Sequence, residues 1–210
     1  WPVMLMNIII SVGGMIVNSV VNQLGVAFLA GYTATNKLYG ALEMAAIAYG
    51  YAMLTYIGQN LGAGKYDRIR RGFRDAVLIA LATSALVGGV MIALRNQIVG
   101  LFISSSGKEA AEATGYAVEY LVIMSATISI LYILHIVRNT LQGLGNTRMP
   151  MVSGLAEFGM RTFMALVVAR RLGGLAIMWG EVAAWIGADL VLVGSLIHEF
   201  RRLGKKSAEK

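Results

Sequence analysis

The sequence predicts an all-α membrane protein, a bundle of about six transmembrane helices. Of its 210 residues, 57% are hydrophobic and only 14% are charged, whereas soluble domains average about 25% charged residues. Its apolar segments each approach the roughly 20 residues that a membrane helix needs. A soluble helical bundle with this many long apolar segments would have too little polar surface to stay dissolved.

The expected transmembrane spans are, in chain order, 2–30, 38–61, 76–94, 115–141, 150–169 and 175–197. The first span lies in a stretch of 36 residues without a charge, and the second contains Glu43 as its one charged residue. The third is uncharged throughout, and the fourth has an uncharged core. We expect residues 1–200 to form one six-helix lobe, and residues 201–210 to form a basic cytoplasmic tail.

The basic residues lie between the apolar segments and give the chain a net charge of +7. With the N-terminus inside the cell, the inner loops and the tail hold eleven Lys and Arg residues, and the outer loops hold five. This bias predicts a multi-pass plasma-membrane protein with a cytoplasmic C-terminus. It accounts for the positive charge without a nucleic-acid partner.

Two similar motifs stand at the expected inner ends of the second and fourth spans. Residues 58–65 read Gly-Gln-Asn-Leu-Gly-Ala-Gly-Lys, and residues 142–148 read Gln-Gly-Leu-Gly-Asn-Thr-Arg. Their shared frame is Gln-x-Leu-Gly-x-x-basic, and it fits either an internal repeat or two helices that end by similar chemistry. Glycines of this kind end helices, whereas the Lys-Ser or Lys-Thr of a phosphate-binding loop is missing.

Together with the run Ala-Thr-Asn-Lys-Leu-Tyr-Gly at 34–40 and the run 138–147, these motifs resemble the multidrug and toxic compound extrusion (MATE) family. The resemblance covers nearly the whole chain and matches the second six-helix half of a twelve-helix transporter. It implies export of organic cations and other amphiphiles, driven by inward flow of Na⁺ or H⁺ as the coupling ion. It also implies a partner, either the missing N-terminal six-helix half or a second copy of the chain.

The sequence departs from part of that family in its first span. Some members carry a carboxylate there that helps to bind the coupling ion, whereas this span has only side-chain amides. The amides are Asn7, Asn18, Asn22 and Gln23. An ion site of that type is therefore not expected in this lobe.

Charged residues inside a membrane span cost roughly 2.5–3.5 kcal/mol on insertion scales, so each needs a partner or access to water. Glu43 either faces a cavity, where it would bind a cation or proton, or lies near enough to the interface to be hydrated. Glu157 and Arg161 are four residues apart, in the order that favours an ion pair on a helix. We expect Arg138 to extend its side chain to the inner interface, and His135 to be a hydrogen-bonded bundle residue or a titrating group.

Glu181 and Asp189 lie about 80° apart around a helix and could form one polar stripe facing a cavity or Arg161. The candidate residues of the substrate and ion pathway are Asn18, Asn22, Asn36, Glu43, Glu157, Arg161, Glu181 and Asp189. The candidate motif residues at the cytoplasmic end are Gln59, Asn60, Gly62, Gly64, Gln142, Gly143 and Gly145.

Three other functions are weaker readings of the same sequence. A lipid-linked-sugar flippase would not explain the motif at 59–65, and a non-transporting membrane scaffold would tolerate loss of Glu43, Asn18 and Asn22. An intramembrane enzyme would need a nucleophile–base pair or a metal triad, and the Ser and His residues form neither at helical spacing. The chain has no Cys, and its two His are far apart, so we expect no metal site. We expect no cofactor besides the coupling ion, Na⁺ or H⁺.

Overall fold

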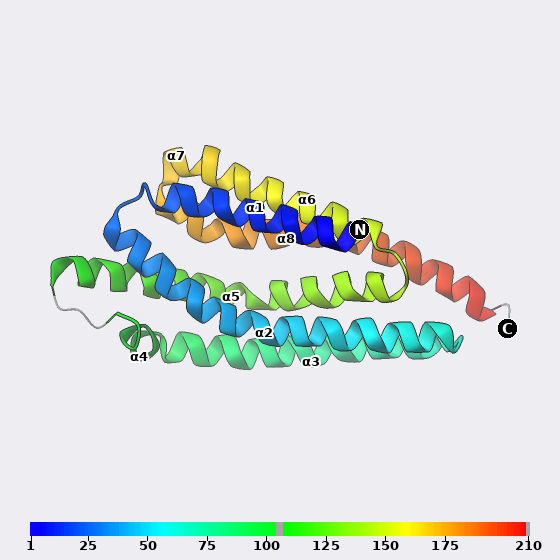
Figure 1. The fold of residues 1–210 in the computed structure, drawn as a ribbon. Helices are drawn as coiled ribbons and strands as arrows, with labels where there is room; N and C mark the ends of the chain where they lie inside the picture. Colours follow the sequence, from blue (N-terminus) through cyan, green and yellow to red (C-terminus); the bar gives the residue numbers. More distant parts are fainter. Residues whose placement is uncertain (104–106, 209–210) are drawn as a thin grey trace.

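The computed structural model describes residues 1–103 and 107–208, which contain helices and no strand. The elements are α1 Pro2–Val21, α2 Val26–Gly62, α3 Tyr66–Ala93, α4 Arg95–Gly100, α5 Lys108–Gly143, α6 Arg148–Phe163, the π-helix η1 Met164–Val168, α7 Ala169–Leu172 and α8 Gly174–Ala208. The segments α6, η1 and α7 follow one another without a break and form one rod (Figure 1). The fold is therefore a bundle of six long rods with the short helix α4 beside it.

Five helical segments of the described chain are long and apolar enough to cross a membrane. They are Pro2–Val21, Tyr66–Ala93, Lys108–Gly143, Arg148–Leu172 and Gly174–Lys205. The sixth rod, α2, does not meet this test and has Lys37 and Glu43 along its length. It packs closely against α5.

The structure differs from the sequence-based expectation at both ends of the chain. The expected first span, 2–30, is divided, because α1 ends at Val21 and α2 begins at Val26. Gly25 separates them with a φ of +98°, a conformation that favours glycine. The expected tail 201–210 continues α8 as far as Ala208, and residues 209–210 lie outside the described chain.

The rods form two groups that pack side by side. Helices α1, α6 and α8 contact one another on one side, and α2, α3 and α5 do so on the other. The two groups meet mainly where α5 packs against α8 (Figure 1). Helix α5 carries the largest share of fully buried side chains, among them Tyr120, Tyr132 and Leu141. It is the central rod of the bundle.

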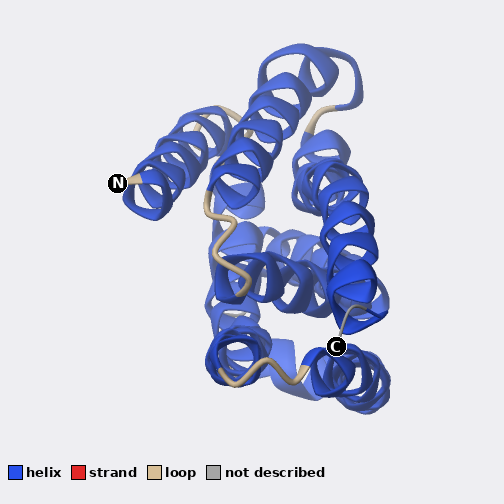
Figure 2. Ribbon diagram, turned by 90° about the vertical axis from the view of Figure 1, so that its right-hand side faces the viewer, coloured by secondary structure: helices blue, strands red, loops and turns tan. Residues whose placement is uncertain are grey.

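Both chain ends lie at one end of the bundle, together with the α2–α3 and α5–α6 turns (Figure 1). Figure 2 views the molecule from that end. The basic residues at the start of α3 and near the end of α8 are therefore gathered at the same end of the bundle. The opposite end carries the α1–α2 turn, α4 and α7.

The two glycine motifs end their helices in the same way. After α2, Gly64 N–H donates to the carbonyl of Leu61 and Lys65 N–H to that of Asn60. After α5, Gly145 N–H donates to the carbonyl of Gln142 and Asn146 N–H to that of Leu141. Both patterns are Schellman caps, with a left-handed glycine just beyond the helix. The φ values of these two glycines are +65° and +85°.

The caps change how the two motifs correspond. The Gln-x-Leu-Gly frame pairs Gly62 with Gly145, whereas the caps pair Gly64 with Gly145 and Gly62 with Gly143. The shared frame is therefore not a structural repeat in that register. The motifs are alike because both helices end with the same cap chemistry.

Glycines also let α5 approach its neighbours closely. A Cβ atom on Gly31 of α2 would lie 2.6 Å from the carbonyl oxygen of Ala113, and one on Gly88 of α3 would lie 2.5 Å from that of Ser125. Real Cβ atoms essentially never come within 3.0 Å of another heavy atom in this way. Because the clashing atom in each case is a backbone carbonyl oxygen of α5, a side chain at either position would force the two helices apart. Small residues allow such close packing in membrane bundles.

Gly88 and Gly89 provide a matched pair for testing this packing. We expect Gly88→Ala to destabilise the lobe by about 1–3 kcal/mol, the usual cost of overpacking. Gly89→Ala should stabilise it by roughly 0.5–1 kcal/mol, because a Cβ there meets nothing within 4 Å. Denaturant unfolding in detergent micelles measures both. Equal stability of the two variants would contradict the packing of α3 against α5.

Candidate functional site

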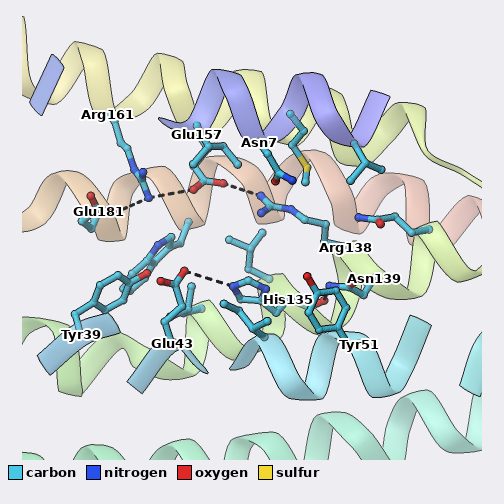
Figure 3. Close-up of a pocket in the computed structure, with 18 residues that line it drawn as sticks. Asn7, Tyr39, Glu43, Tyr51, His135, Arg138, Asn139, Glu157, Arg161 and Glu181 are labelled. Carbon is cyan, nitrogen blue, oxygen red and sulfur yellow. Dashed lines mark hydrogen bonds and ion pairs between the residues drawn. The ribbon is translucent and has the colours of Figure 1, made fainter. Parts of the chain in front are cut away.

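Side chains from both helix groups enclose a cavity of about 380 Å³. Helices α1, α6 and α8 of one group line one side of the cavity, and helices α2 and α5 of the other group line the opposite side (Figure 3). Its polar lining consists of Asn7, Tyr39, Glu43, Tyr51, His135, Arg138, Asn139, Gln142, Glu157, Arg161 and Glu181. The apolar lining includes Leu131, Leu134 and Trp185. So many ionisable groups around one cavity of a membrane bundle indicate a functional site.

Four charged residues cross the cavity as a continuous ionic chain, made of Arg138, Glu157, Arg161 and Glu181 (Figure 3). Glu157 accepts from Arg138 at 2.7 Å through Oε2 and from Arg161 at 3.1 Å through Oε1. Arg161 also pairs with Glu181 at 2.6 Å. This ionic chain joins α5, α6 and α8, and its two positive charges balance its two negative charges.

The ionic chain partly confirms and partly corrects the expectations from the sequence. Glu157 and Arg161 form the pair that their spacing predicts, and Glu181 faces Arg161 as one of the two alternatives proposed. The expectation for Arg138 is wrong. Its side chain is buried and points at Glu157 instead of reaching the interface. A buried guanidinium needs a carboxylate partner to offset the loss of its hydration, and Glu157 supplies that partner inside the bundle.

A second, looser pair lies across the cavity from the ionic chain. Glu43 Oε1 of α2 is 3.8 Å from His135 Nε2 of α5 (Figure 3), within reach of an ion pair but longer than a hydrogen bond. The Glu43 side chain is 32% exposed and the His135 side chain 14%, whereas Glu157 is 5% exposed. Of the two open alternatives for Glu43, the structure supports the one in which it faces a cavity.

Three of the expected pathway residues lie elsewhere. Asn18, Asn22 and Asn36 line a separate open hollow with Tyr32 and Lys37, formed by the end of α1 and the start of α2. The hollow therefore lies toward the opposite end of the bundle from the chain termini. These three amides therefore line this hollow and not the cavity.

Asp189 does not share the cavity with Glu181. It is absent from the cavity lining, and its Oδ1 atom is buried without a hydrogen-bond partner among the described residues. The polar stripe expected from the spacing of the two acids therefore reaches the cavity only through Glu181.

The motif residues that the sequence predicts at the cytoplasmic end lie at or near the ends of α2 and α5. Asn60 Nδ2 donates to the carbonyl of Tyr56, Gln59 is exposed, and Gly62, Gly64 and Gly145 belong to the helix ends. Gly143 lies against α2, where a Cβ would be 2.9 Å from the Leu54 carbonyl oxygen. Gln142 alone among them lines the cavity.

The sequence reading missed the aromatic wall of the cavity. Tyr39 stacks against Trp185, with ring centroids 5.8 Å apart, and Tyr51 lines the cavity further along α2. The available signal was spacing, because Tyr39 precedes Glu43 by one helical turn and so shares its face. Trp185 follows Glu181 by the same spacing.

The cavity lining combines acidic, basic and aromatic side chains. The lining holds three carboxyl groups, those of Glu43, Glu157 and Glu181, and two guanidinium groups. Aromatic faces attract cations through their quadrupole. Among the described residues, no three His, Cys, Asp or Glu side chains are grouped closely enough to hold a metal ion.

Comparisons with known proteins agree in family and in fold. The chain matches the MatE family over residues 2–167. It is 26% identical to the Probable multidrug resistance protein NorM of Synechocystis sp. over 188 residues, covering 89% of this chain and 40% of that protein. It is 25% identical to the Probable multidrug resistance protein YoeA of Bacillus subtilis over 201 residues, covering 92% of this chain and 41% of that protein.

A solved structure shows the same fold. It is described as the outward-facing conformation of a multidrug resistance MATE family transporter of the MOP superfamily, and it superposes with a TM-score of 0.82 at 15% identity. The match covers 90% of this chain and 42% of that one. The chain therefore spans about 40% of the length of the relatives that it matches.

Proposed function

Because this chain belongs to the MatE family of multidrug efflux transporters, we propose that it forms one lobe of an antiporter that exports organic cations in exchange for Na⁺ or H⁺. Members of this family are transporters and not enzymes. The observation that carries the proposal is the cavity, which combines an excess acidic group with the Tyr39–Trp185 aromatic wall. Such a lining suits a flat or amphiphilic cation.

A second lobe would complete the transporter. The chain covers 40% and 41% of the two relatives, and long apolar side chains of α1, including Met4, Ile8 and Met15, are exposed. We propose that the missing six-helix half, or a second copy, lies beside this lobe in the membrane. The basic residues gathered at the end with both termini support a cytoplasmic position for that end.

Ethidium efflux by the complete transporter, meaning this chain assembled with its second lobe, tests the proposal in cells that lack other drug exporters. Wild-type protein should lower ethidium accumulation. Tyr39→Leu should weaken ethidium binding about fivefold, which corresponds to about 1 kcal/mol of lost cation–π attraction. The measurement is the ethidium concentration that gives half-maximal efflux.

Tyr116→Leu is the matched control, because Tyr116 is a partly exposed tyrosine outside the cavity. The proposal would be refuted by wild-type cells that keep as much ethidium as cells without the protein. In that case a membrane scaffold would be the better description. Equal effects of Tyr39→Leu and Tyr116→Leu would show that ethidium transport does not depend on this cavity.

A further inference from the structure

We propose that a hollow at the end of the bundle that carries both termini binds the phosphate headgroup of an anionic phospholipid from the adjoining membrane leaflet. The hollow has a volume of about 310 Å³ and lies between the α5–α6 turn and the last part of α8, apart from the cavity described above. The inference takes from the proposed function only the cytoplasmic position of this end, and it does not depend on transport.

The polar lining of the hollow consists mainly of groups that can donate hydrogen bonds. Arg148 and Arg202 contribute two guanidinium groups, and Asn146 and Thr147 contribute an amide and a hydroxyl. Arg148 is exposed and has no carboxylate within 4.0 Å in the parts of the chain that the structure describes. The Arg202 side chain is 65% exposed. Guanidinium groups bind phosphate oxygens through paired, charge-assisted hydrogen bonds, so this lining suits a phosphate group.

One carboxylate, that of Glu199, also lines the hollow, and it already has partners. Its Oε1 atom accepts from Asn146 Nδ2 at 3.1 Å, and its Oε2 atom lies 4.0 Å from Arg202 Nη1. Asn146 Nδ2 also donates to Ser195 Oγ at 3.4 Å, and Asn146 Oδ1 accepts from the Met149 N–H at 3.3 Å. These contacts fasten the α5–α6 turn to α8, so the hollow is a built part of the fold.

The charges along the rod of α6, η1 and α7 place the hollow at the depth of lipid headgroups. Twenty-two residues separate Arg148 from Arg170, which is about 33 Å along a helix and close to the roughly 30 Å thickness of the hydrocarbon core. The acid and the base between them, Glu157 and Arg161, belong to the ionic chain inside the bundle. Arg148 and Arg170 therefore lie near opposite faces of the membrane, each at the level of the phosphates.

An exposed apolar stripe runs from Arg148 into the membrane and favours a lipid over a free phosphate ion. Val152 and Leu155 follow Arg148 by four and seven residues, so they share its face of α6. Their side chains are 38% and 47% exposed, and Leu144 adds an apolar side chain to the hollow itself. A phospholipid would place its phosphate at the arginines and an acyl chain along the stripe. Basic pockets between membrane helices on the cytoplasmic side bind anionic headgroups in this way.

Native mass spectrometry of the complete transporter in neutral detergent tests the site. The protein is titrated with phosphatidylglycerol and with phosphatidylcholine that carry the same acyl chains, and wild-type protein should bind phosphatidylglycerol about tenfold more tightly. The double variant Arg148→Gln with Arg202→Gln should weaken phosphatidylglycerol binding about tenfold, because each basic residue near an anionic lipid contributes a few-fold in affinity. The double variant Arg148→Lys with Arg202→Lys keeps both charges and should lose less.

The double variant Arg68→Gln with Arg71→Gln is the matched control. It removes the same charge from two exposed arginines at the same end of the bundle, outside the hollow, and its phosphatidylglycerol affinity should stay within about threefold of wild type. Equal losses in the two Gln pairs would show diffuse attraction to the basic end and would overturn the site. Equal binding of the two lipids, or displacement of the lipid by glycerol phosphate at the same concentration, would overturn an anionic lipid as the ligand.

The lipid titration and the ethidium efflux assay are separate measurements. Lipid binding as expected, without any efflux, would refute the proposed function and leave the lipid site standing. Efflux as expected, with no difference between the two Gln pairs in lipid binding, would refute the lipid site and leave the proposed function standing.

Discussion

Glu157→Gln is expected to lower the free energy of unfolding of this lobe by about 3–5 kcal/mol, the usual cost of removing one partner from a buried ion pair. Glutamine has nearly the same shape, so packing changes little. The substitution removes a negative charge, and Glu157 contacts both Arg138 and Arg161. Without it Arg138 has no acidic partner within 4.0 Å among the described residues, and Arg161 retains Glu181. Unfolding of the purified protein in mixed micelles with increasing denaturant measures the loss.

Two variants show whether the loss comes from the unpaired arginine. Glu119→Gln removes an exposed acid of α5 and should change stability by less than about 0.5 kcal/mol. The double variant Glu157→Gln with Arg138→Gln removes both members of one pair, and it should recover part of the loss because neighbouring residues are not additive. A Glu157→Gln protein as stable as the Glu119→Gln protein would show that the ionic chain does not stabilise the fold.

Trp185→Ala should lower the free energy of unfolding by about 3 kcal/mol, the low end of the range for truncating a buried aromatic side chain. The low end applies because lipid is itself apolar, so the loss comes mainly from packing. Trp185 is 1% exposed and stacks on Tyr39, whereas Trp179 on the same helix is 43% exposed. Trp179→Ala should therefore change stability by less than about 1 kcal/mol.

The same denaturant experiment compares the two tryptophan variants, and fluorescence of the remaining tryptophans reports the transition. Because Trp185 also lines the cavity, its loss should reduce ethidium efflux beyond the effect of stability. Equal unfolding midpoints for the two variants would contradict the burial of Trp185.

The sequence predicts the helices well because apolar length is a local property. Long uncharged stretches mark the rods, and glycine-rich motifs mark two of their ends. The hydropathy pattern does not reveal the break between α1 and α2, because residues 1–36 contain no charged side chain. Its signal is chemical instead, since the two amides Asn22 and Gln23 precede Gly25, which adopts a left-handed φ.

Contacts in the candidate site are predictable from the sequence only where both interacting residues lie on the same helix. The Glu157–Arg161 pair follows from a separation of four residues. Arg138 and Glu157 lie on different helices, and Glu43 and His135 come from opposite parts of the sequence, so helical spacing relates neither pair. Their partners depend on how α2, α5 and α6 pack, and that packing is set by close backbone approaches such as the one at Gly31.

The ionic chain also bears on how the lobe responds to membrane voltage. Moving one elementary charge across the membrane involves about 2.3 kcal/mol of electrical work per 100 mV. Arg138 and Arg161 are paired with Glu157 and Glu181, so the formal charges of these four side chains sum to zero. A displacement of the four side chains as one unit would therefore carry almost no net charge through the electric field and would involve little electrical work.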